Sequence, residues 1–206
     1  MGKPAKTLMK RLSLYFLFIF ITISCSNNET DTSCSDEFQI INDLCYYQKD
    51  LDILNEFISN GQLTMNVQDF DTSGNNIIEP LELAVNHLNG MKWNELGRLT
   101  KLWLTHDNLS GSIPENIGDL EYLDTLNLSF NELEGNIPQS INNLVNLKWF
   151  YLRYNNLSGS IPDEICDIYP NFINFLIEGN NFCPPYPECI PQEKIGTQIT
   201  ADCIDL

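Results

Sequence analysis

The sequence predicts an α/β solenoid, in which similar coils stack on one another and none buries its apolar face alone. Three consecutive stretches of 24 residues carry the same residue types at nine matched positions. Each stretch opens with apolar residues alternating with outward ones, as in Leu102-Trp103-Leu104, which is the two-residue period of a β-strand. Cysteines lie on both sides of the repeats and predict disulfide-bonded caps. The matched residues are Leu99, Leu102, Leu104, Leu109, Gly111, Ile113, Pro114, Ile117 and Leu120; Leu123, Leu126, Leu128, Leu133, Gly135, Ile137, Pro138, Ile141 and Leu144; and Leu147, Phe150, Leu152, Leu157, Gly159, Ile161, Pro162, Ile165 and Ile168.

Within each unit the pattern predicts a short strand followed by a turn. Asn131, Asn155 and Asn180 follow the strands, where a side-chain amide can bond backbone groups of its own turn and of the neighbouring one. The first unit departs from this pattern, because Asp107 occupies the aligned position. The following Gly-x-Ile-Pro reverses the chain, since Gly tolerates conformations closed to other residues and Pro fixes φ without leaving a donor unpaired.

The shared template, L-x-x-L-x-L-x-x-N-x-L-x-G-x-I-P, resembles the leucine-rich repeat. The subtype with Gly-x-Ile-Pro is best known from plant receptor ectodomains and also occurs in bacterial surface proteins. The resemblance implies a curved stack with short parallel strands on the concave side and 3₁₀ or irregular structure on the convex side. It also implies that the variable positions between the inward leucines face a concave groove.

The ends of the array are less regular, as expected of capping repeats. After Ile168 the register slips by one residue, and a truncated unit fits residues 172–182. Upstream, an imperfect opening repeat fits 78–98, and a short capping helix over 78–90 is the alternative. The predicted units are about 78–98, 99–122, 123–146, 147–171 and 172–182, between an N-terminal capping region at 34–77 and a C-terminal cap at 183–206.

The first 24 residues are typical of an export signal, because four basic residues precede an apolar run that is too short for a transmembrane helix. Ser24 and Cys25 at the end of that run resemble the bacterial lipobox, which implies lipidation of Cys25 and a polar tether over 25–33. We therefore predict an exported lipoprotein of a bacterial cell envelope or surface. Secretion without the lipid and an uncleaved anchor are the alternatives.

With Cys25 lipidated, six cysteines remain, an even number that predicts three disulfides in an exported chain. Fifteen pairings of six cysteines are possible. Locality favours Cys34 with Cys45, Cys166 with Cys183, and Cys189 with Cys203.

The chain is strongly acidic, with a net charge of −17. Removing residues 1–24 with their four basic residues leaves 7 Lys and Arg against 28 Asp and Glu, a net charge of −21. Such a surface repels the phosphates of nucleic acids and of anionic lipids, so we expect no nucleic-acid partner and a membrane link through the acyl chain alone.

Neither an enzyme nor a cofactor is expected. His87 and His106 have no nucleophile nearby in a recognisable motif, and no Gly-rich phosphate loop is present. The segment 69–75 begins like a calcium loop but has Pro80 where a bidentate Glu is required, which favours a polar turn. The Pro-rich stretch 183–189 lacks a metal-ligand pattern, so the sequence predicts no metal site.

Aromatic residues occupy several variable positions that the resemblance places in the concave groove. Exposed aromatic clusters tend to mark binding sites, because Tyr and Trp offer large contact areas with few rotatable bonds. The alternative is that the rings pack on one another and stabilise the sheet without a ligand. The candidate ligand contacts are Trp103, His106, Asn127, Phe130, Trp149, Tyr151, Arg153 and Tyr154.

These observations predict a non-enzymatic surface module that binds an extracellular protein or peptide through its aromatic concave face. Two alternatives stay open: recognition of a polysaccharide or cell-wall glycan, and an architectural envelope protein without a discrete ligand.

Overall fold

The computed structural model describes residues 35–41, 44–60, 90–201 and 203. Several predictions fall outside these residues, so they stay predictions. They concern the export signal over 1–24, lipidation of Cys25, the tether over 25–33, most of the opening repeat at 78–98, and the turn at 69–75.

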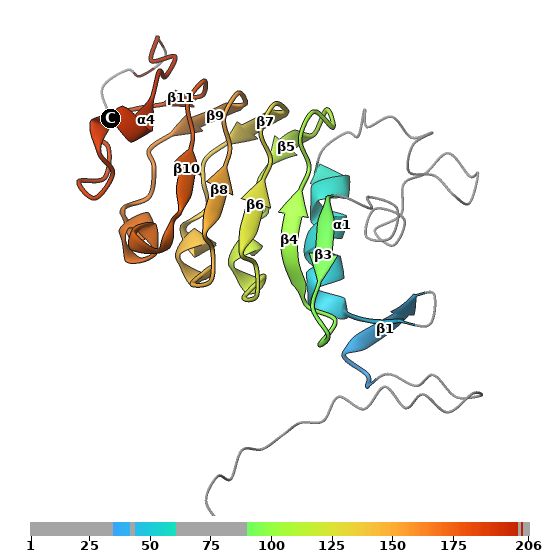
Figure 1. The fold of residues 1–206 in the computed structure, drawn as a ribbon. Coiled ribbons are helices and arrows are strands. Elements are labelled where there is room, and N and C mark those ends of the chain that lie inside the picture. Colours follow the sequence, from blue (N-terminus) through green and yellow to red (C-terminus); the bar gives the residue numbers. More distant parts are fainter. Residues whose placement is uncertain (1–34, 42–43, 61–89, 202, 204–206) are drawn as a thin grey trace, which may run out of the picture.

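The repeated strands form one sheet that runs the length of the stack (Figure 1). Strands β4 (Leu99–Trp103), β6 (Thr125–Asn127), β8 (Trp149–Tyr151) and β10 (Asn174–Leu176) pair in parallel. Strand β3 (Met91–Trp93) pairs antiparallel with β4 and closes the sheet at its N-terminal edge. The predicted parallel sheet is therefore confirmed.

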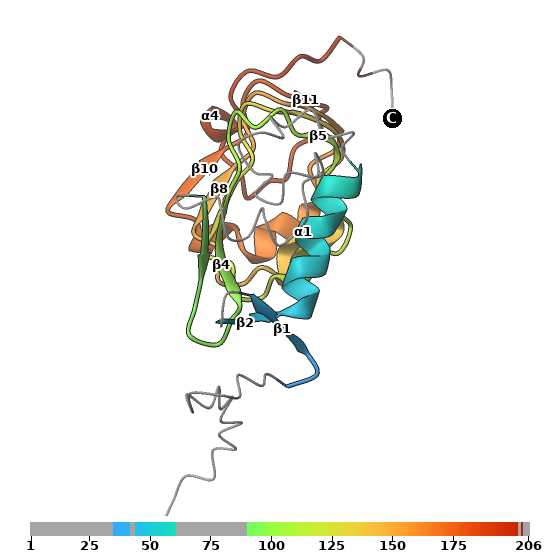
Figure 2. The same cartoon turned by 90° about the vertical axis from the view of Figure 1, so that its right-hand side faces the viewer.

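A second parallel sheet, which the sequence did not predict, continues each coil. It consists of β5 (Ser110–Ser112), β7 (Glu132–Gly135), β9 (Asn156–Gly159) and β11 (Asn181–Phe182). The 3₁₀ helices η1 (Ile117–Asp119), η2 (Gln139–Asn143), η3 (Asp163–Asp167) and η4 (Tyr169–Asn171) follow these strands on the convex side. Viewed along the stack, the coils enclose one apolar interior between the two sheets and the helices (Figure 2).

The core consists of columns of equivalent side chains from successive coils. Leu102, Leu126 and Phe150 stand side by side in adjacent strands, and all three are fully buried. Each such side chain contributes about 1.5–3 kcal/mol of burial free energy. The sequence period and the packing therefore have one cause: an apolar residue is needed wherever a column crosses a coil.

The predicted asparagine ladder satisfies the backbone inside the turns. Asn155 accepts a hydrogen bond from the Leu133 N–H at 3.1 Å, and its Nδ2 donates to the carbonyls of Leu128 and Leu152 at 2.9 Å each. Asn131 and Asn180 make the equivalent bonds to their own and preceding coils. Asn131 also accepts from the N–H of Asp107, so the departure at that position leaves the ladder intact.

The N-terminal cap consists of a hairpin and a helix. Strands β1 (Phe38–Ile41) and β2 (Leu44–Tyr47) pair antiparallel, and α1 (Gln48–Asn60) follows directly. The helix lies across the end of the stack, with Leu51, Leu54 and Phe57 almost fully buried (Figure 2). It thereby covers the apolar face that the first coil would otherwise expose to water.

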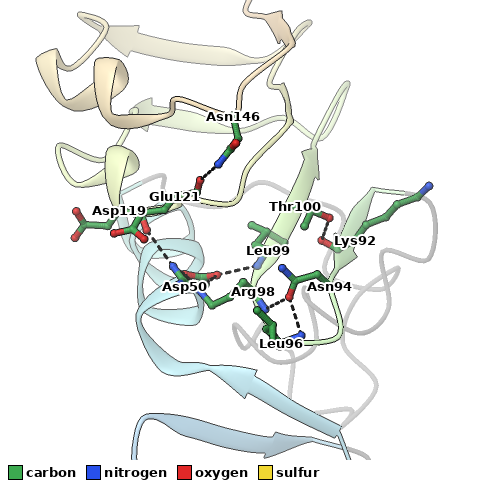
Figure 3. Close-up of polar contacts among 10 residues, drawn as sticks. All are labelled: Asp50, Lys92, Asn94, Leu96, Arg98, Leu99, Thr100, Asp119, Glu121 and Asn146. Atoms are coloured by element: carbon green, nitrogen blue, oxygen red, sulfur yellow. Dashed lines mark hydrogen bonds and ion pairs between the residues drawn. The ribbon is translucent and has the colours of Figure 1, made fainter. Parts of the chain in front are cut away.

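A buried ion pair fixes this cap to the first repeat (Figure 3). Asp50 is fully buried in α1, and its Oδ2 lies 3.1 Å from Nε of Arg98. The same oxygen accepts the Leu99 N–H at 2.8 Å. Burial raises the pKa of the Asp50 carboxyl, while the hydrogen bonds from Arg98 and Leu99 oppose that shift. The Arg98 guanidinium also stacks on the rings of Tyr47 and Tyr122, at 4.0 and 4.7 Å.

The C-terminal cap covers the other end of the stack. Helix α4 (Gln192–Ile195) buries Ile195 and is followed by backbone bonds that tie the chain to the last coil. The Gly179 N–H donates to the carbonyl of Thr197, and the Ile199 N–H donates to the carbonyl of Asn180. In the described part of the chain, no helix combines the length and the apolar character needed to cross a bilayer.

The disulfides of this cap differ from the pairing that locality favoured. Cys166 bonds Cys189 and Cys183 bonds Cys203, so the expected Cys166–Cys183 and Cys189–Cys203 bridges are wrong. In a solenoid, residues meet the equivalent position of the next coil. The last coils align with an offset of 23 residues, since Phe182 pairs with Gly159. That offset places Cys189 in the column of Cys166, whereas Cys183 falls beside residue 160.

Cys45 is also disulfide-bonded, and its partner lies outside the described residues. The predicted Cys34–Cys45 bridge therefore stays a prediction.

Peptide mapping of the non-reduced protein is expected to yield one fragment joining Cys166 to Cys189 and another joining Cys183 to Cys203. Replacing Cys166 and Cys189 together by Ser should lower the free energy of unfolding by about 3 kcal/mol, because the bridge closes a loop of moderate length. Denaturant titration under non-reducing conditions measures this loss. A fragment joining Cys166 to Cys183 would contradict the column argument.

Candidate ligand-binding site

The candidate site is the solvent-facing side of β3, β4, β6, β8 and β10, here called the concave sheet face. The ladder register aligns Trp103, Asn127, Tyr151 and Leu176 in one row across it. A second row contains Lys101, Thr125, Trp149 and Asn174. Seven of the eight predicted contact residues are half-buried or exposed on this face, and Asn127 is the exception.

Asn127 lies beneath two aromatic rings. Its side chain is 6% exposed, and its Oδ1 accepts the Ser129 N–H at 2.9 Å. Trp103 and Tyr151 flank it from the neighbouring strands and meet edge to face, with ring centroids 6.1 Å apart. Asn127 therefore supports the floor of the face, while the two rings present their surfaces to solvent.

A second group of rings lies where the strands end. His106, Phe130 and Tyr154 occupy equivalent positions in successive coils, and their rings stack at centroid distances of 4.4 and 4.8 Å. All three residues have left-handed backbones, with φ of 62°, 58° and 55°. Bulky residues seldom adopt this conformation, which costs roughly 1–2 kcal/mol per residue. The chain therefore carries large rings where Asn or Gly would be less strained.

The ring column ends at Gly179, which has a φ of 72°. A Cβ at this position would lie 2.6 Å from the ring of Tyr154. Glycine thus admits the left-handed turn and leaves room for the ring, so the column can extend to the last coil.

Two shallow hollows lie on the concave sheet face and share Trp103 and Tyr151. The first, of about 390 Å³, is bordered by Lys92, Lys101, Asp124 and Trp149 as well. The second, of about 340 Å³, is bordered by the His106 and Phe130 rings and by Arg153. The face therefore offers a continuous surface of aromatic plates rather than one deep pocket.

Cationic groups lie against several of these rings. The Lys101 ammonium lies 4.6 Å from the centroid of Trp103, and the Arg153 guanidinium lies 5.0 Å from that of Phe130. Arg153 also forms an ion pair with Glu178 at 3.6 Å. Burial and the neighbouring Lys92 lower the pKa of Lys101.

The structure supports both interpretations of the aromatic residues in part. The rings do pack on one another, as the structural alternative expected, yet they leave substantial ring surface open: Tyr154 is 50% exposed. The charged residues and the backbone strain of the ring column could not be read from the spacing alone. No group of three or more metal-ligating side chains occurs in the part of the chain that the structure describes.

A third hollow, of about 630 Å³, lies at the C-terminal edge between Tyr154, Gly179 and α4. The sequence analysis did not identify it, because its walls come from the cap. Lys194 and Ile199 of this cap have no counterpart in the repeat pattern, so only the tertiary structure brings them beside Tyr154.

Comparison with known proteins agrees with this architecture. Residues 97–157 match the family model of the leucine rich repeat. Among curated proteins, none matches the chain.

Solved structures share the fold. The crystal structure of PEPR1-AtPEP1 is 22% identical, covers 69% of this chain and 19% of that chain, and has a TM-score of 0.57. The ectodomain of the receptor kinase SOBIR1 from Arabidopsis thaliana is 31% identical over 41% of this chain and 46% of that chain, with a TM-score of 0.39. The Arabidopsis receptor kinase HAESA, in complex with the peptide hormone IDA and the co-receptor SERK1, is 36% identical over 44% of this chain and 15% of that chain, with a TM-score of 0.42.

This chain thus spans less than half the length of each of these receptor chains. The likeness in fold and the match over the central units agree with the sequence template. The coils of this protein form a leucine-rich repeat solenoid.

Proposed function

We propose that the protein is an exported leucine-rich repeat module that binds an extracellular protein or peptide through its concave sheet face. Leucine-rich repeat modules of this kind bind other molecules and are not enzymes, so the protein is a non-enzymatic module. Its disulfides indicate an oxidising compartment and hence export. A lipid anchor at Cys25 remains part of the proposal, supported by the signal-like residues before it.

The observation that carries this proposal is the row of aromatic plates. Trp103, Tyr151 and the stacked His106, Phe130 and Tyr154 expose ring surface at positions that a solvent-facing sheet would fill with polar residues. Large rings in left-handed backbones cost free energy in the free protein. A ligand that covers the rings offsets this cost, since buried aromatic area dominates the energetics of many interfaces.

The Arabidopsis structures that share the coil architecture include complexes named for a peptide partner. This is analogy at the level of the fold, and it favours a protein or peptide over the other ligand classes without naming one. Stacked rings also suit sugars, so a glycan is the outcome to be excluded by experiment.

Alanine substitutions at Trp103 and Tyr151 test the proposal. Each variant is expected to weaken binding of peptides selected from a random library by at least tenfold, because central aromatic anchors carry about 2 kcal/mol or more. Its melting temperature should fall by only a few degrees, since both rings are half exposed. Binding is measured by titration and stability by calorimetry.

The matched control is Tyr122→Ala, because Tyr122 is exposed and does not border either hollow. A large fall in melting temperature with unchanged binding would show that the rings stabilise the sheet alone. Selective capture on a glycan array, with no peptide selected, would favour the glycan instead.

A further inference from the structure

The concave sheet face is positively charged on a protein that is otherwise strongly acidic. The whole chain carries 11 Lys and Arg against 28 Asp and Glu. Three of these basic residues, Lys92, Lys101 and Arg153, border the two hollows of the face. In the part of the chain that the structure describes, Asp124 is the single acidic residue that borders them. The local charge balance is therefore opposite in sign to that of the molecule.

Two of the cations face each other across strands. Lys92 of β3 pairs directly with Lys101 of β4 in the antiparallel register. Like charges at directly opposite positions destabilise a sheet. The aligned positions of the next two strands carry Thr125 and Trp149, so the repeat itself does not require a cation there. An anion bound between the two ammonium groups would remove this repulsion.

Aromatic surface separates the lysine pair from the third cation. Trp103 and Tyr151 lie between Lys101 on β4 and Arg153 just after β8. Strands β4 and β8 are two strand spacings apart, about 10 Å, which an extended peptide covers in about three residues. The face thus alternates cation, apolar plate and cation along the direction that crosses the strands.

We propose that the occupant of the concave sheet face is an acidic peptide segment. Its carboxylates, about three residues apart, would contact Lys92 with Lys101 at one side and Arg153 at the other, while an apolar side chain between them covers Trp103 and Tyr151. This inference rests on the proposed function and adds the chemistry of the partner. The attraction would also orient the segment during encounter, because the surrounding acidic surface repels it.

Selection of random twelve-residue peptides on the immobilised protein tests the composition of the occupant. The wild-type protein is expected to enrich sequences with two acidic residues about three positions apart and an apolar residue between them. Enrichment of peptides with no acidic excess would overturn the acidic preference while keeping the proposed function. If no peptide is enriched, the proposed function itself fails.

The variant Lys92→Glu/Lys101→Glu then tests the position of the contact, with one selected peptide synthesised as the probe. Its dissociation constant is expected to rise at least tenfold, and the dependence of binding on salt should weaken. Lys49→Glu is the matched control, since Lys49 is exposed on α1 and borders neither hollow, and it should change affinity less than twofold.

A milder variant, Lys92→Gln/Lys101→Gln, keeps the test valid if the glutamates disturb folding. Unchanged affinity in a folded double variant would overturn the inference, even where Trp103→Ala abolishes binding. Preferential binding of sulfated or uronate oligosaccharides, with no peptide selected, would contradict a peptide occupant and assign the cations to an anionic glycan.

Discussion

Replacing Asn155 by Ala is expected to lower the free energy of unfolding by on the order of 4 kcal/mol, the largest loss we expect from a single polar side chain. The side chain is 6% exposed and bonds three backbone groups inside the stack. Its removal leaves the Leu133 N–H and the carbonyls of Leu128 and Leu152 without their amide partner. Each unsatisfied buried group costs about 1–3 kcal/mol, with relaxation reducing the sum.

Asn155→Asp is the informative companion variant. A carboxylate can still accept the Leu133 N–H, but it cannot donate to the two carbonyls that Asn155 contacts. It should therefore also destabilise the protein, and more strongly when ionised because the site is buried. Asn143→Ala is the control, since Asn143 is exposed at the end of η2. Equal stability of Asn155→Ala and the control in denaturant titration would contradict the ladder's role.

Replacing Asp50 by Ala is expected to cost about 3–5 kcal/mol, because it leaves the partner charge of a buried pair uncompensated. Arg98 contacts both carboxylate oxygens, at 3.1–3.3 Å, and the Leu99 N–H loses its acceptor as well. The side chains are 1% and 12% exposed, so water can replace little of this. Thermal and denaturant unfolding measure the loss.

The control for this substitution is Asp52→Ala. Asp52 lies one half-turn further along α1, is exposed, and accepts a single hydrogen bond from Gln48. It should change stability by less than about 1 kcal/mol. Amide hydrogen exchange adds a local readout: Asp50→Ala should expose α1 and the first coil more than the last coils, because each coil contacts mainly its neighbours. Uniform loss of protection would instead show that the stack unfolds as one unit.

These two effects bear on the proposed function through the shape of the concave sheet face. Trp103 lies in the first coil, directly behind the cap that Asp50 and Arg98 fix, and β3 with Lys92 closes the same edge (Figures 1 and 3). A loosened cap is expected to displace the lysine pair relative to the rings of β8. Loss of binding in Asp50→Ala is therefore an effect on positioning, and only variants on the face itself test contact.

The sequence by itself determined the stack of coils, because one apolar residue per column is a requirement that recurs at a fixed period. It predicted the sheet register that aligns Trp103, Asn127 and Tyr151, and the asparagine ladder, since both repeat with the same spacing. Features without a period were beyond it. The bridges of Cys166 and Cys183 depend on which columns meet at the irregular last coil.

Only the tertiary structure decided which aromatic and charged residues form the candidate site. Asn127 occupies the same row as Trp103 and Tyr151, yet it is covered by them because their rings are large enough to meet above it. The pairing of Lys92 with Lys101 arises from an antiparallel strand that breaks the parallel repeat. Likewise, Asp50 and Arg98 are 48 residues apart, and no local pattern relates them. Periodic packing is encoded locally in each unit, whereas contacts at the caps and between unlike side chains depend on how distant segments come together.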